Sequence, residues 1–442
     1  MAKKKPNIRF NGFEEEWEEK SFSETYITAS EGGTPSTSVE EYYENGDIPF
    51  VKIEDTEQKY IYDTSSHITE EGKNHSSAWL IPTDNIIFTN GATIGNVAIN
   101  KVPVTTKQGI LGVVQDKEKF DLEYLFYALS SDDFQEEVRR RQSKGTFATI
   151  ILRNLDKIKL PTTSLPEQQK IGEFFRQLDE LISAKEEELA KLRQIKSALL
   201  DAMFPSDEQE ANRGGYKTLI NSDLRLNSEL VITAPAPNTP RIRFRGFTEP
   251  WEKTYIGRLM DVGSVKRVHQ SDWTSNGIRF LRARDLVAFF EKSDIEDKLY
   301  ISRDLYNSFS VVSGKVSKDD LLVTGVGTIG IPYLIPNKEP VYFKDGNIIW
   351  LKNNNLVYGR FLYHSFTSEY ITKFIKESAG VGTVGTYTIT TCKNTPILLP
   401  EKKEQQRIGD FFHQQDDNIN NAKLQIDKLR TIKQACLQGM FV

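Results

Sequence analysis

Two long stretches of the chain carry hydrophobic residues at the spacing of three and four that is typical of an amphipathic helix. They run from Pro166 to Phe204 and from Glu404 to Phe441, and they align with each other without a gap. The hydrophobic seam of the first stretch consists of Ile171, Phe175, Leu178, Ile182, Leu189, Leu192, Leu199 and Met203. At about 1.5 Å of rise per residue, each helix would be roughly 57 Å long. Because charged side chains occupy the other faces, we expect the two helices to pair as a coiled coil.

The duplication extends over the rest of the chain. The segment at 8–13, followed by Trp17, returns at 242–247, followed by Trp251, and the glycine-containing run at 86–95 returns at 321–330. Each half therefore contains a globular domain followed by one long helix. The predicted order is a globular domain at 1–163, a helix at 164–204, a linker at 205–239, a globular domain at 240–400 and a helix at 401–442.

Within each globular half, β-branched runs interrupted by glycine-rich turns predict β-hairpins. Helical stretches are expected at 122–141 and at 358–378. The predicted fold class is α+β, with two tandem domains and a pair of long helices.

The long helices carry two local signals. Ser164 and Glu167 have the spacing of a capping box at the start of the first helix. Gly172 and Gly409 lie at equivalent positions inside the helical pattern, where glycine costs about 1 kcal/mol relative to alanine. We interpret these two glycines as sites of close approach by another backbone; chance retention after duplication is the alternative.

The composition narrows the function classes. The chain has 442 residues, enough for two or three domains, and a net charge of −5, which neither indicates nor excludes nucleic-acid binding. Two cysteines fit a reducing cytoplasm, and no apolar run is long enough for a membrane span. Neither the histidines and cysteines nor the carboxylates show a metal-ligand or catalytic spacing, and no phosphate-binding loop or Asn-Pro-Pro-Tyr motif occurs. We expect a cytoplasmic protein that catalyses nothing by itself and binds no metal.

Local clusters of basic residues point to DNA binding, because Lys and Arg neutralise phosphates and Arg pairs with guanine edges. The candidate DNA-binding residues are Lys101, Lys107, Arg139, Arg140, Arg141, Lys144, Lys266, Arg267, Arg279, Arg282 and Arg284. For any single residue, a solvated surface with salt bridges is an equally good interpretation. For the clusters together we favour DNA, since two similar domains match a split duplex site.

With these features, the chain resembles the DNA specificity (S) subunits of type I restriction–modification systems. The resemblance is carried by the two helix starts, Pro166–Ile171 and Glu404–Ile408, by Gly32–Ser36, by the Thr-Ile-Gly hairpins and by Gly277–Asp285. It covers nearly the whole chain. The second half has Gly263-Ser264-Val265-Lys266 in place of a clear Gly-Gly-Thr-Pro sequence, which suggests that the two domains read different DNA.

The resemblance implies that each globular half is a target recognition domain for one part of a bipartite, asymmetric DNA site. By this resemblance, the two long helices would pack antiparallel and set the length of the gap between the two parts of the DNA site. The lysines in the hydrophobic seam and the length of the linker are compatible with either a parallel or an antiparallel pair. Two methyltransferase (M) subunits and ATP-dependent restriction (R) subunits would bind, with S-adenosylmethionine, ATP and Mg in those partners and no cofactor in this chain.

The helix starts would face the M subunits. The candidate partner-binding residues are Gln168, Gln169, Phe174, Phe175, Gln405, Gln406, Phe411 and Phe412. The alternative function is a helical scaffold that organises partner proteins without sequence-specific DNA readout.

Overall fold

The chain folds into two compact units. The computed structural model describes residues 6–143, 148–205, 229–234, 236–337, 339–353, 355–379 and 385–441. Its contacts divide the chain into unit 1, Met1–Glu186 with Leu424–Val442, and unit 2, Glu187–Lys423. Each boundary falls inside one of the long helices, so both helices contribute to both units. Most of the linker expected at 205–239 lies outside the described residues.

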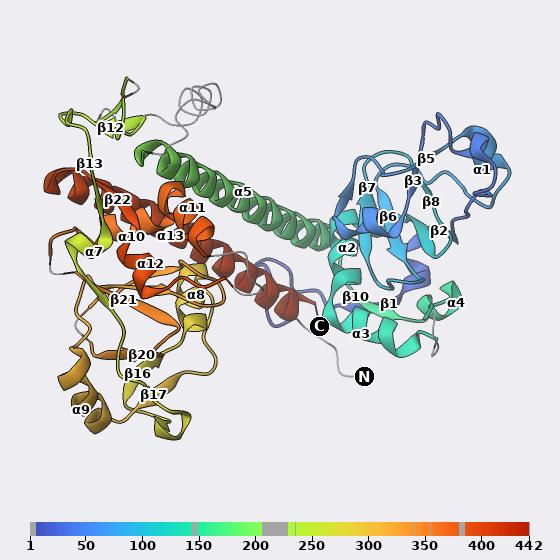
Figure 1. Cartoon of the computed structure of the whole chain (residues 1–442). Helices are drawn as coiled ribbons and strands as arrows, with labels where there is room; N and C mark the ends of the chain where they lie inside the picture. Colours follow the sequence, from blue (N-terminus) through green and yellow to red (C-terminus); the bar gives the residue numbers. More distant parts are fainter. Residues whose placement is uncertain are drawn as a thin grey trace. The chain divides into compact units, whose positions relative to one another are not determined.

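Unit 1 is built around a five-stranded sheet with the order β2-β9-β6-β7-β4, accompanied by the three-stranded sheet β5-β3-β8 and the pair β1-β10 (Figure 1). Its strands are β1 (Glu18–Ser21), β2 (Tyr26–Glu31), β3 (Ile48–Val51), β4 (Tyr60–Ile61), β5 (His67–Ile68), β6 (Asn85–Thr89), β7 (Val97–Asn100), β8 (Thr105–Thr106), β9 (Ile110–Gln115) and β10 (Lys159–Thr162). Its helices before the long one are η1 (Phe22–Glu24), η2 (Glu40–Tyr42), η3 (Ile53–Glu57), α1 (Glu70–Asn74), α2 (Leu122–Ser130), α3 (Asp132–Arg141) and α4 (Leu152–Leu155).

Unit 2 contains two four-stranded sheets, β14-β21-β18-β19 and β15-β17-β16-β20, and the pairs β11-β12 and β13-β22. Its strands are β11 (Leu230–Ile232), β12 (Ile242–Phe244), β13 (Glu252–Tyr255), β14 (Asp261–Gly263), β15 (Trp273–Thr274), β16 (Ile278–Leu281), β17 (Leu299–Ile301), β18 (Leu321–Thr324), β19 (Pro332–Leu334), β20 (Val341–Phe343), β21 (Ile348–Lys352) and β22 (Pro396–Leu399). Its helices before the long one are α7 (Ile256–Leu259), η4 (Gln270–Asp272), α8 (Ala283–Glu291), α9 (Arg303–Ser313), α10 (Gly359–Thr367), α11 (Glu369–Ser378) and α12 (Ile389–Lys393). The predicted α+β class is confirmed.

The central strands of both units are buried on both faces. In β6, Ile86 belongs to the core shared with α2, whereas its neighbour Ile87 belongs to a second cluster on the opposite face. In β18, Leu321 and Leu322 divide between two cores in the same way. Successive strand residues point to opposite faces, so an uninterrupted apolar run is what a strand buried on both sides requires.

The two predicted glycine-containing hairpins are present. Strand β6 pairs antiparallel with β7, and β18 pairs antiparallel with β19. The backbone N–H of Gly95 donates to Thr89 at 2.9 Å, and that of Gly330 donates to Thr324 at 2.8 Å. Both glycines have a positive φ, +100° and +80°, which a residue with a side chain adopts only at a cost.

The predicted helical stretch at 122–141 is two helices, α2 and α3, and its counterpart at 358–378 is likewise divided into α10 and α11. The break falls at Ser131 in one and at Ser368 in the other, both with extended backbone dihedrals. Each serine hydroxyl donates to the carbonyl three residues earlier, at 2.7 and 2.6 Å. Short side-chain to backbone hydrogen bonds of this kind compete with helix continuation.

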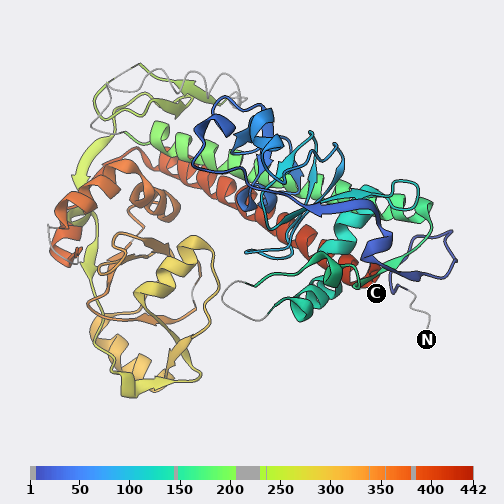
Figure 2. The ribbon, with the colours of Figure 1, turned by 90° about the vertical axis from the view of Figure 1, so that its right-hand side faces the viewer.

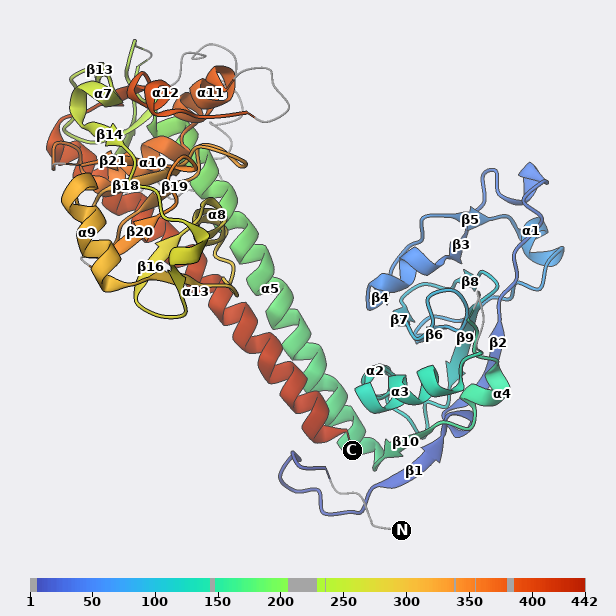
Figure 3. The ribbon, with the colours of Figure 1, turned by 60° about the horizontal axis from the view of Figure 1, so that its bottom comes forward.

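The long helices are α5 (Leu165–Met203) and α13 (Lys402–Met440), each 39 residues long. Within unit 1, Asp179 lies 2.5 Å from Lys433, and Glu186 lies 2.6 Å from Arg430. The partner number falls as the position along α5 rises, so the helices are antiparallel, and Figures 2 and 3 show them side by side. Among the described residues, no helix is both long and apolar enough to cross a membrane.

Gly172 and Gly409 are close-approach sites, as predicted. A Cβ atom on Gly172 would lie 2.8 Å from the backbone nitrogen of Tyr124, and one on Gly409 would lie 2.8 Å from that of Phe361. Neither helix could carry a side chain there without moving the helix that packs against it.

Candidate nucleic-acid and subunit interfaces

The start of each long helix is tied to its own globular domain by an inward-facing glutamine. The Gln168 side chain accepts a hydrogen bond from the backbone N–H of Asp121 at 3.0 Å and donates to Thr163 at 2.7 Å. Gln405 does the same with Tyr358 and Pro400, at 3.0 and 2.9 Å. Equivalent positions in these two arrangements differ by 237 in residue number, as Ile171 and Ile408 do.

A buried ion pair lies beside each of these glutamines. Arg9 donates two hydrogen bonds to Glu167, at 2.7 and 2.8 Å, and Arg243 donates two to Glu404 at the same distances. Both carboxylates are fully buried. The capping box expected between Ser164 and Glu167 is therefore replaced: the Glu167 carboxylate binds Arg9 and the Thr163 hydroxyl. A bidentate arginine–carboxylate pair is the geometry that best compensates the loss of hydration of both charges.

Each domain is closed by the far end of the other long helix. In unit 1 the Phe441 ring lies 5.3 Å from that of Tyr124 and 6.0 Å from that of Phe175. In unit 2 the Phe204 ring lies 5.5 Å from the ring of Phe361, and Phe361 is the residue equivalent to Tyr124. The segment before β1 also contributes, since the N–H of Ile8 donates to the carbonyl of Gly439 at 2.9 Å (Figure 3).

The candidate partner-binding residues separate into an inner and an outer group. Gln168, Phe175, Gln405 and Phe412 are buried inside their own units. Gln169 and Gln406 are exposed, and Phe174 and Phe411 are partly exposed. Only the outer group can therefore contact another subunit while this fold is intact.

In unit 2, three of the candidate DNA-binding arginines gather around one buried carboxylate. Arg282 and Arg279 lie 3.4 and 3.6 Å from Asp285, which is 1% exposed, and Arg284 lies 4.0 Å from it. Arg279 also donates to the carbonyls of Phe280 and Leu299, both at 2.9 Å, and burial lowers the pKa of its guanidinium. Asp285 accepts from the N–H of Arg282 at the start of α8.

These contacts give Arg279 and Arg282 a role within the fold. Their side chains are only 18% and 17% exposed, whereas that of Arg284 is 56% exposed and lies 3.1 Å from Asp297. Arg267 is exposed and pairs with Asp345 at 2.9 Å. Lys266 is exposed, with its ammonium 4.3 Å from the centre of the Phe309 ring.

In unit 1 three of the five described candidate DNA-binding residues are ion-paired as well. Lys101 lies 2.7 Å from Asp84, Arg140 pairs with Glu136 and Glu137, and Arg141 pairs with Glu137. Lys107 and Arg139 are exposed, and within the described residues neither has an acidic partner. Lys144 lies outside the described residues.

A catalytic or metal centre does not emerge from the described residues. Among them, no group of three or more His, Cys, Asp or Glu side chains could hold a metal ion. The two cysteines are free, and Cys392 is buried, where desolvation raises the pKa of its thiol to about 12. A thiol with so high a pKa is a poor nucleophile.

Comparison with known families agrees with the duplicated architecture. The type I restriction modification DNA specificity domain matches residues 14–194 and again 251–429. The chain belongs to this family. The homologous specificity subunits are the non-catalytic subunits of type I restriction–modification systems.

Curated relatives show how far the S-family likeness extends. The MjaIX specificity subunit of Methanocaldococcus jannaschii is 25% identical over 432 residues, covering 96% of this chain and 92% of the relative. The EcoR124I/EcoR124II specificity subunit of Escherichia coli is 30% identical over 164 residues, covering 36% of this chain and 40% of the relative.

Solved structures show the same fold. The crystal structure of the type I restriction–modification S subunit from M. genitalium has a TM-score of 0.56 at 16% identity, and the match covers 99% of both chains. A chain from a structure describing assembly and conformational transition of the type I system has a TM-score of 0.53 at 15% identity, covering 95% of this chain and 96% of that chain. The family match does not favour the scaffold alternative.

Several residues that build the S-subunit scaffold are absent from the sequence-based candidates. Arg9 and Arg243 are the buried partners of the helix starts, and Asp285 holds the arginine cluster of unit 2. The sequence did contain a signal for the first two, because Ile-Arg-Phe is duplicated at 8–10 and 242–244.

Proposed function

We propose that this S-family chain recognises a bipartite, asymmetric DNA site, with one part read by each unit, and positions two adenine-methyltransferase subunits on it. ATP-dependent restriction subunits join the same assembly, and S-adenosylmethionine, ATP and Mg are bound by these partners. The chain itself contributes position and sequence choice. Adenines chosen in this way are flipped out of the duplex by the methyltransferase subunits.

The observation that carries this proposal is the repeated junction between domain and helix. Gln168 and Gln405 make the same two hydrogen bonds at equivalent positions, and Arg9–Glu167 repeats as Arg243–Glu404. The junction between domain and helix is therefore built in the same way in each unit. A partner that binds one junction has an equivalent surface at the other.

The outer residues of the helix starts are the best candidates for that surface. Phe174 packs edge-on against Phe10, with ring centres 5.7 Å apart, and Phe411 packs in the same way against Phe244 at 5.8 Å. Both rings remain partly exposed, and Gln169 and Gln406 are exposed beside them. Partly exposed aromatic rings held rigidly by a neighbour lose little conformational entropy when a partner covers them.

For DNA contacts we place Lys107 and Arg139 in unit 1 and Lys266 in unit 2 ahead of the other candidates. These three are exposed and, among the described residues, have no acidic partner that DNA would have to displace. Four further candidates could contact DNA if its phosphates replaced their present acidic partners: Arg284, Arg267, Arg140 and Arg141. Arg279 and Arg282 hold Asp285 at the start of α8. They would therefore affect DNA recognition indirectly, by fixing the position of α8.

The decisive experiment is adenine-methylation sequencing of cells that express the methyltransferase subunit with and without this chain. A split motif that appears only with the chain supports the proposal, and the absence of any split motif contradicts it. Lys107→Ala should weaken methylation through the half-site read by unit 1, and Lys266→Ala through the other. Each should also reduce the salt slope of DNA binding by about 0.9 for one lost phosphate contact.

The matched control is Lys101→Ala, which removes a lysine from unit 1 that is already paired with Asp84. It should change the salt slope less than Lys107→Ala does. If Lys107→Ala and Lys266→Ala each weaken methylation of both half-sites equally, the proposed division of the DNA site between the two units is wrong.

A further inference from the structure

One corner of the repeated scaffold is built alike in both units. Asp179 of α5 lies 2.5 Å from Lys433, and at the equivalent position in unit 2, Asp416 of α13 lies 2.5 Å from Lys196. The helix that packs on this carboxylate carries Phe126 and Tyr127 in unit 1, and Tyr363 and His364 in unit 2. The two corners therefore share a carboxylate, a lysine across the helix pair and an aromatic wall.

In unit 1 a second lysine fills this corner. The ammonium of Lys59 lies 2.5 Å from the Tyr127 hydroxyl, 2.8 Å from Glu123 and 3.5 Å from Asp179. It also lies 4.9 Å from the ring centre of Phe126 and 4.3 Å from that of Tyr127. Carboxylates with aromatic faces are the environment that a desolvated ammonium group prefers.

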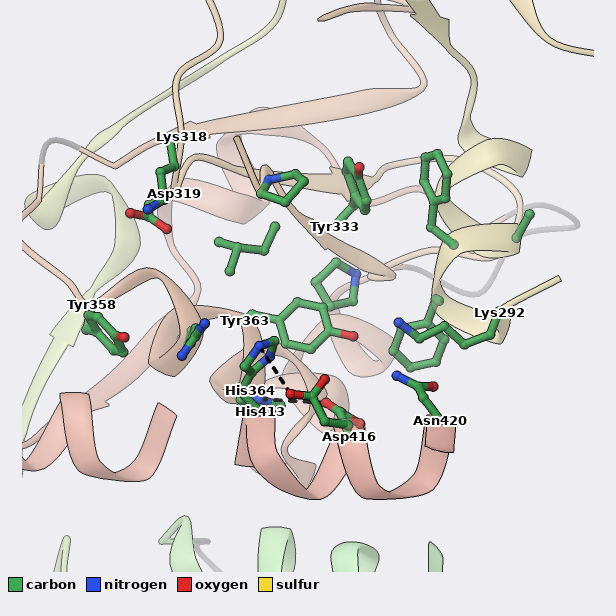
Figure 4. A pocket seen from close by; sticks show the side chains of 18 of the residues that line it. Lys292, Lys318, Asp319, Tyr333, Tyr358, Tyr363, His364, His413, Asp416 and Asn420 are labelled. Atoms are coloured by element: carbon green, nitrogen blue, oxygen red, sulfur yellow. Dashed lines mark ion pairs between the residues drawn. The ribbon is translucent and has the colours of Figure 1, made fainter. Parts of the chain in front are cut away.

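In unit 2 the same corner opens into a cavity of about 640 Å³ between α8, α10 and α13. Figure 4 shows His413, Asp416 and Asn420 on the α13 side, Tyr333 on the opposite side and Lys292 reaching in from the side of α8. Three carboxylates line the cavity: Asp319, Asp416 and Asp417. Within the described residues only Asp416 has a Lys or Arg partner, while Asp417 lies 3.7 Å from His413.

The cavity wall also contains a buried polar atom that no described residue satisfies. His364 is 2% exposed, and its Nδ1 makes no hydrogen bond to the part of the chain that the structure describes, while its Nε2 lies 3.9 Å from Asp416. Burial lowers the pKa of His364 well below its ordinary value, so the ring is neutral and one of its nitrogens is an acceptor. A buried acceptor without a donor is destabilising unless a ligand or another donor satisfies it.

Among the described residues, the other cationic side chains at the cavity do not bind its carboxylates as Lys59 binds Glu123 and Asp179 in unit 1. Arg360 lies 2.6 Å from Asp410, outside the lining carboxylates. Lys292 and Lys318 are exposed, and neither forms an ion pair within the described residues. Lys292 therefore lies at the mouth of the cavity as a like charge toward any cation that enters.

We propose that the cavity bounded by α8, α10 and α13 binds a primary alkylammonium group in the position that Lys59 fills in unit 1. The ammonium is held by Asp416, Asp417 and the Tyr363 ring. Its aliphatic stem lies along the stacked rings of Phe289 and Tyr333, whose centres are 4.6 Å apart. The group belongs either to a free diamine or to a lysine side chain of a bound subunit.

The test is calorimetric titration of the purified full chain with cadaverine, which has the stem and the ammonium of a lysine side chain. We expect saturable binding of one cadaverine per chain at millimolar concentrations, and none of 1-pentanol, which lacks the charge. Absence of saturable cadaverine binding, or equal binding of 1-pentanol, would overturn the proposal.

Two surface substitutions test whether the cavity prefers a cation or an anion. Lys292→Met removes the like charge at the mouth and should tighten cadaverine binding, whereas Asp417→Asn should weaken it, each by about two- to fivefold. If Lys292→Met weakens the binding instead, the cavity is an anion site and the proposal is wrong. Lys59→Met should open the corner of unit 1 and raise the stoichiometry to two; a folded Lys59→Met chain that still binds one cadaverine contradicts the equivalence of the corners.

The same titration on the chain assembled with methyltransferase subunits separates the two sources. Retained binding identifies a free diamine as the ligand, and loss of binding identifies a lysine from the bound subunit. The inference is independent of DNA readout, because these titrations contain no DNA and the proposed function is tested by methylation.

Discussion

The two glycines inside the long helices offer a test in which two physical effects have opposite signs. Replacing Gly409 by alanine improves the intrinsic helix propensity of α13 by about 1 kcal/mol. The added Cβ, however, would lie 2.8 Å from the backbone nitrogen of Phe361 and 3.0 Å from the Cβ of Arg360. Overpacking of this kind costs about 1–3 kcal/mol, and backbone atoms give way less easily than side-chain ends.

We therefore expect Gly409→Ala to lower the free energy of unfolding by up to about 2 kcal/mol after the propensity gain is subtracted. The first turn of α10 cannot move away freely, because the N–H of Tyr358 is bonded to Gln405 at 3.0 Å. Gly172→Ala should have the same effect in unit 1, where the contact is with Tyr124.

The measurement is urea unfolding followed by helical circular dichroism, with hydrogen exchange of the α10 amides as the local readout. Gly439→Ala is the matched control in the same helix, because the atoms nearest to its Cβ would be side-chain atoms of Ile8, whose Cδ1 and Cγ1 can rotate away, and not backbone atoms. A Gly409→Ala chain that is more stable by about 1 kcal/mol would refute the close approach, since propensity alone would then govern the position.

Three further predictions concern buried charge and helix continuity. Arg243→Met should cost about 3–5 kcal/mol by stranding the buried Glu404, and adding Glu404→Leu should restore most of the loss in urea unfolding. Because burial lowers the pKa of His364, the unfolded chain takes up a proton that the folded chain does not; stability should fall as the pH drops below 6.5, and His364→Phe should flatten this slope in pH-dependent thermal unfolding. Leu189→Pro and Ile426→Pro should each cost about 3 kcal/mol or more and change the gap length read by methylation sequencing; an unchanged gap would argue against a spacer role for the helices.

The basic residues show where reasoning from sequence reached its limit. Arg279, Arg282 and Arg284 form a dense local cluster, and density alone made them candidates for DNA contacts. The structure places a buried carboxylate, Asp285, among them, so two of the three are largely committed to the fold. A charge count along the chain cannot reveal which arginine faces a buried acid, because burial depends on segments that are distant in sequence.

The helix starts show the same limit at the level of single neighbours. Gln168 and Gln169 are adjacent and chemically identical, yet the first is buried against Asp121 and the second is exposed. Phe174 and Phe175 divide in the same way. Periodicity indicates that one face of a helix is apolar, but it does not say which polar residue beside that face will be needed by a neighbouring backbone.

The two long helices carried the clearest information in the sequence alone. Hydrophobic period, gapless duplication and the recurring Gly172 and Gly409 determined their extent, their equivalence and the places where another backbone comes close, since these follow from local spacing. Their antiparallel direction was decided only by the tertiary structure, through pairs such as Asp179 with Lys433. An amphipathic seam is compatible with either direction, so only contacts between residues far apart in the chain can select one.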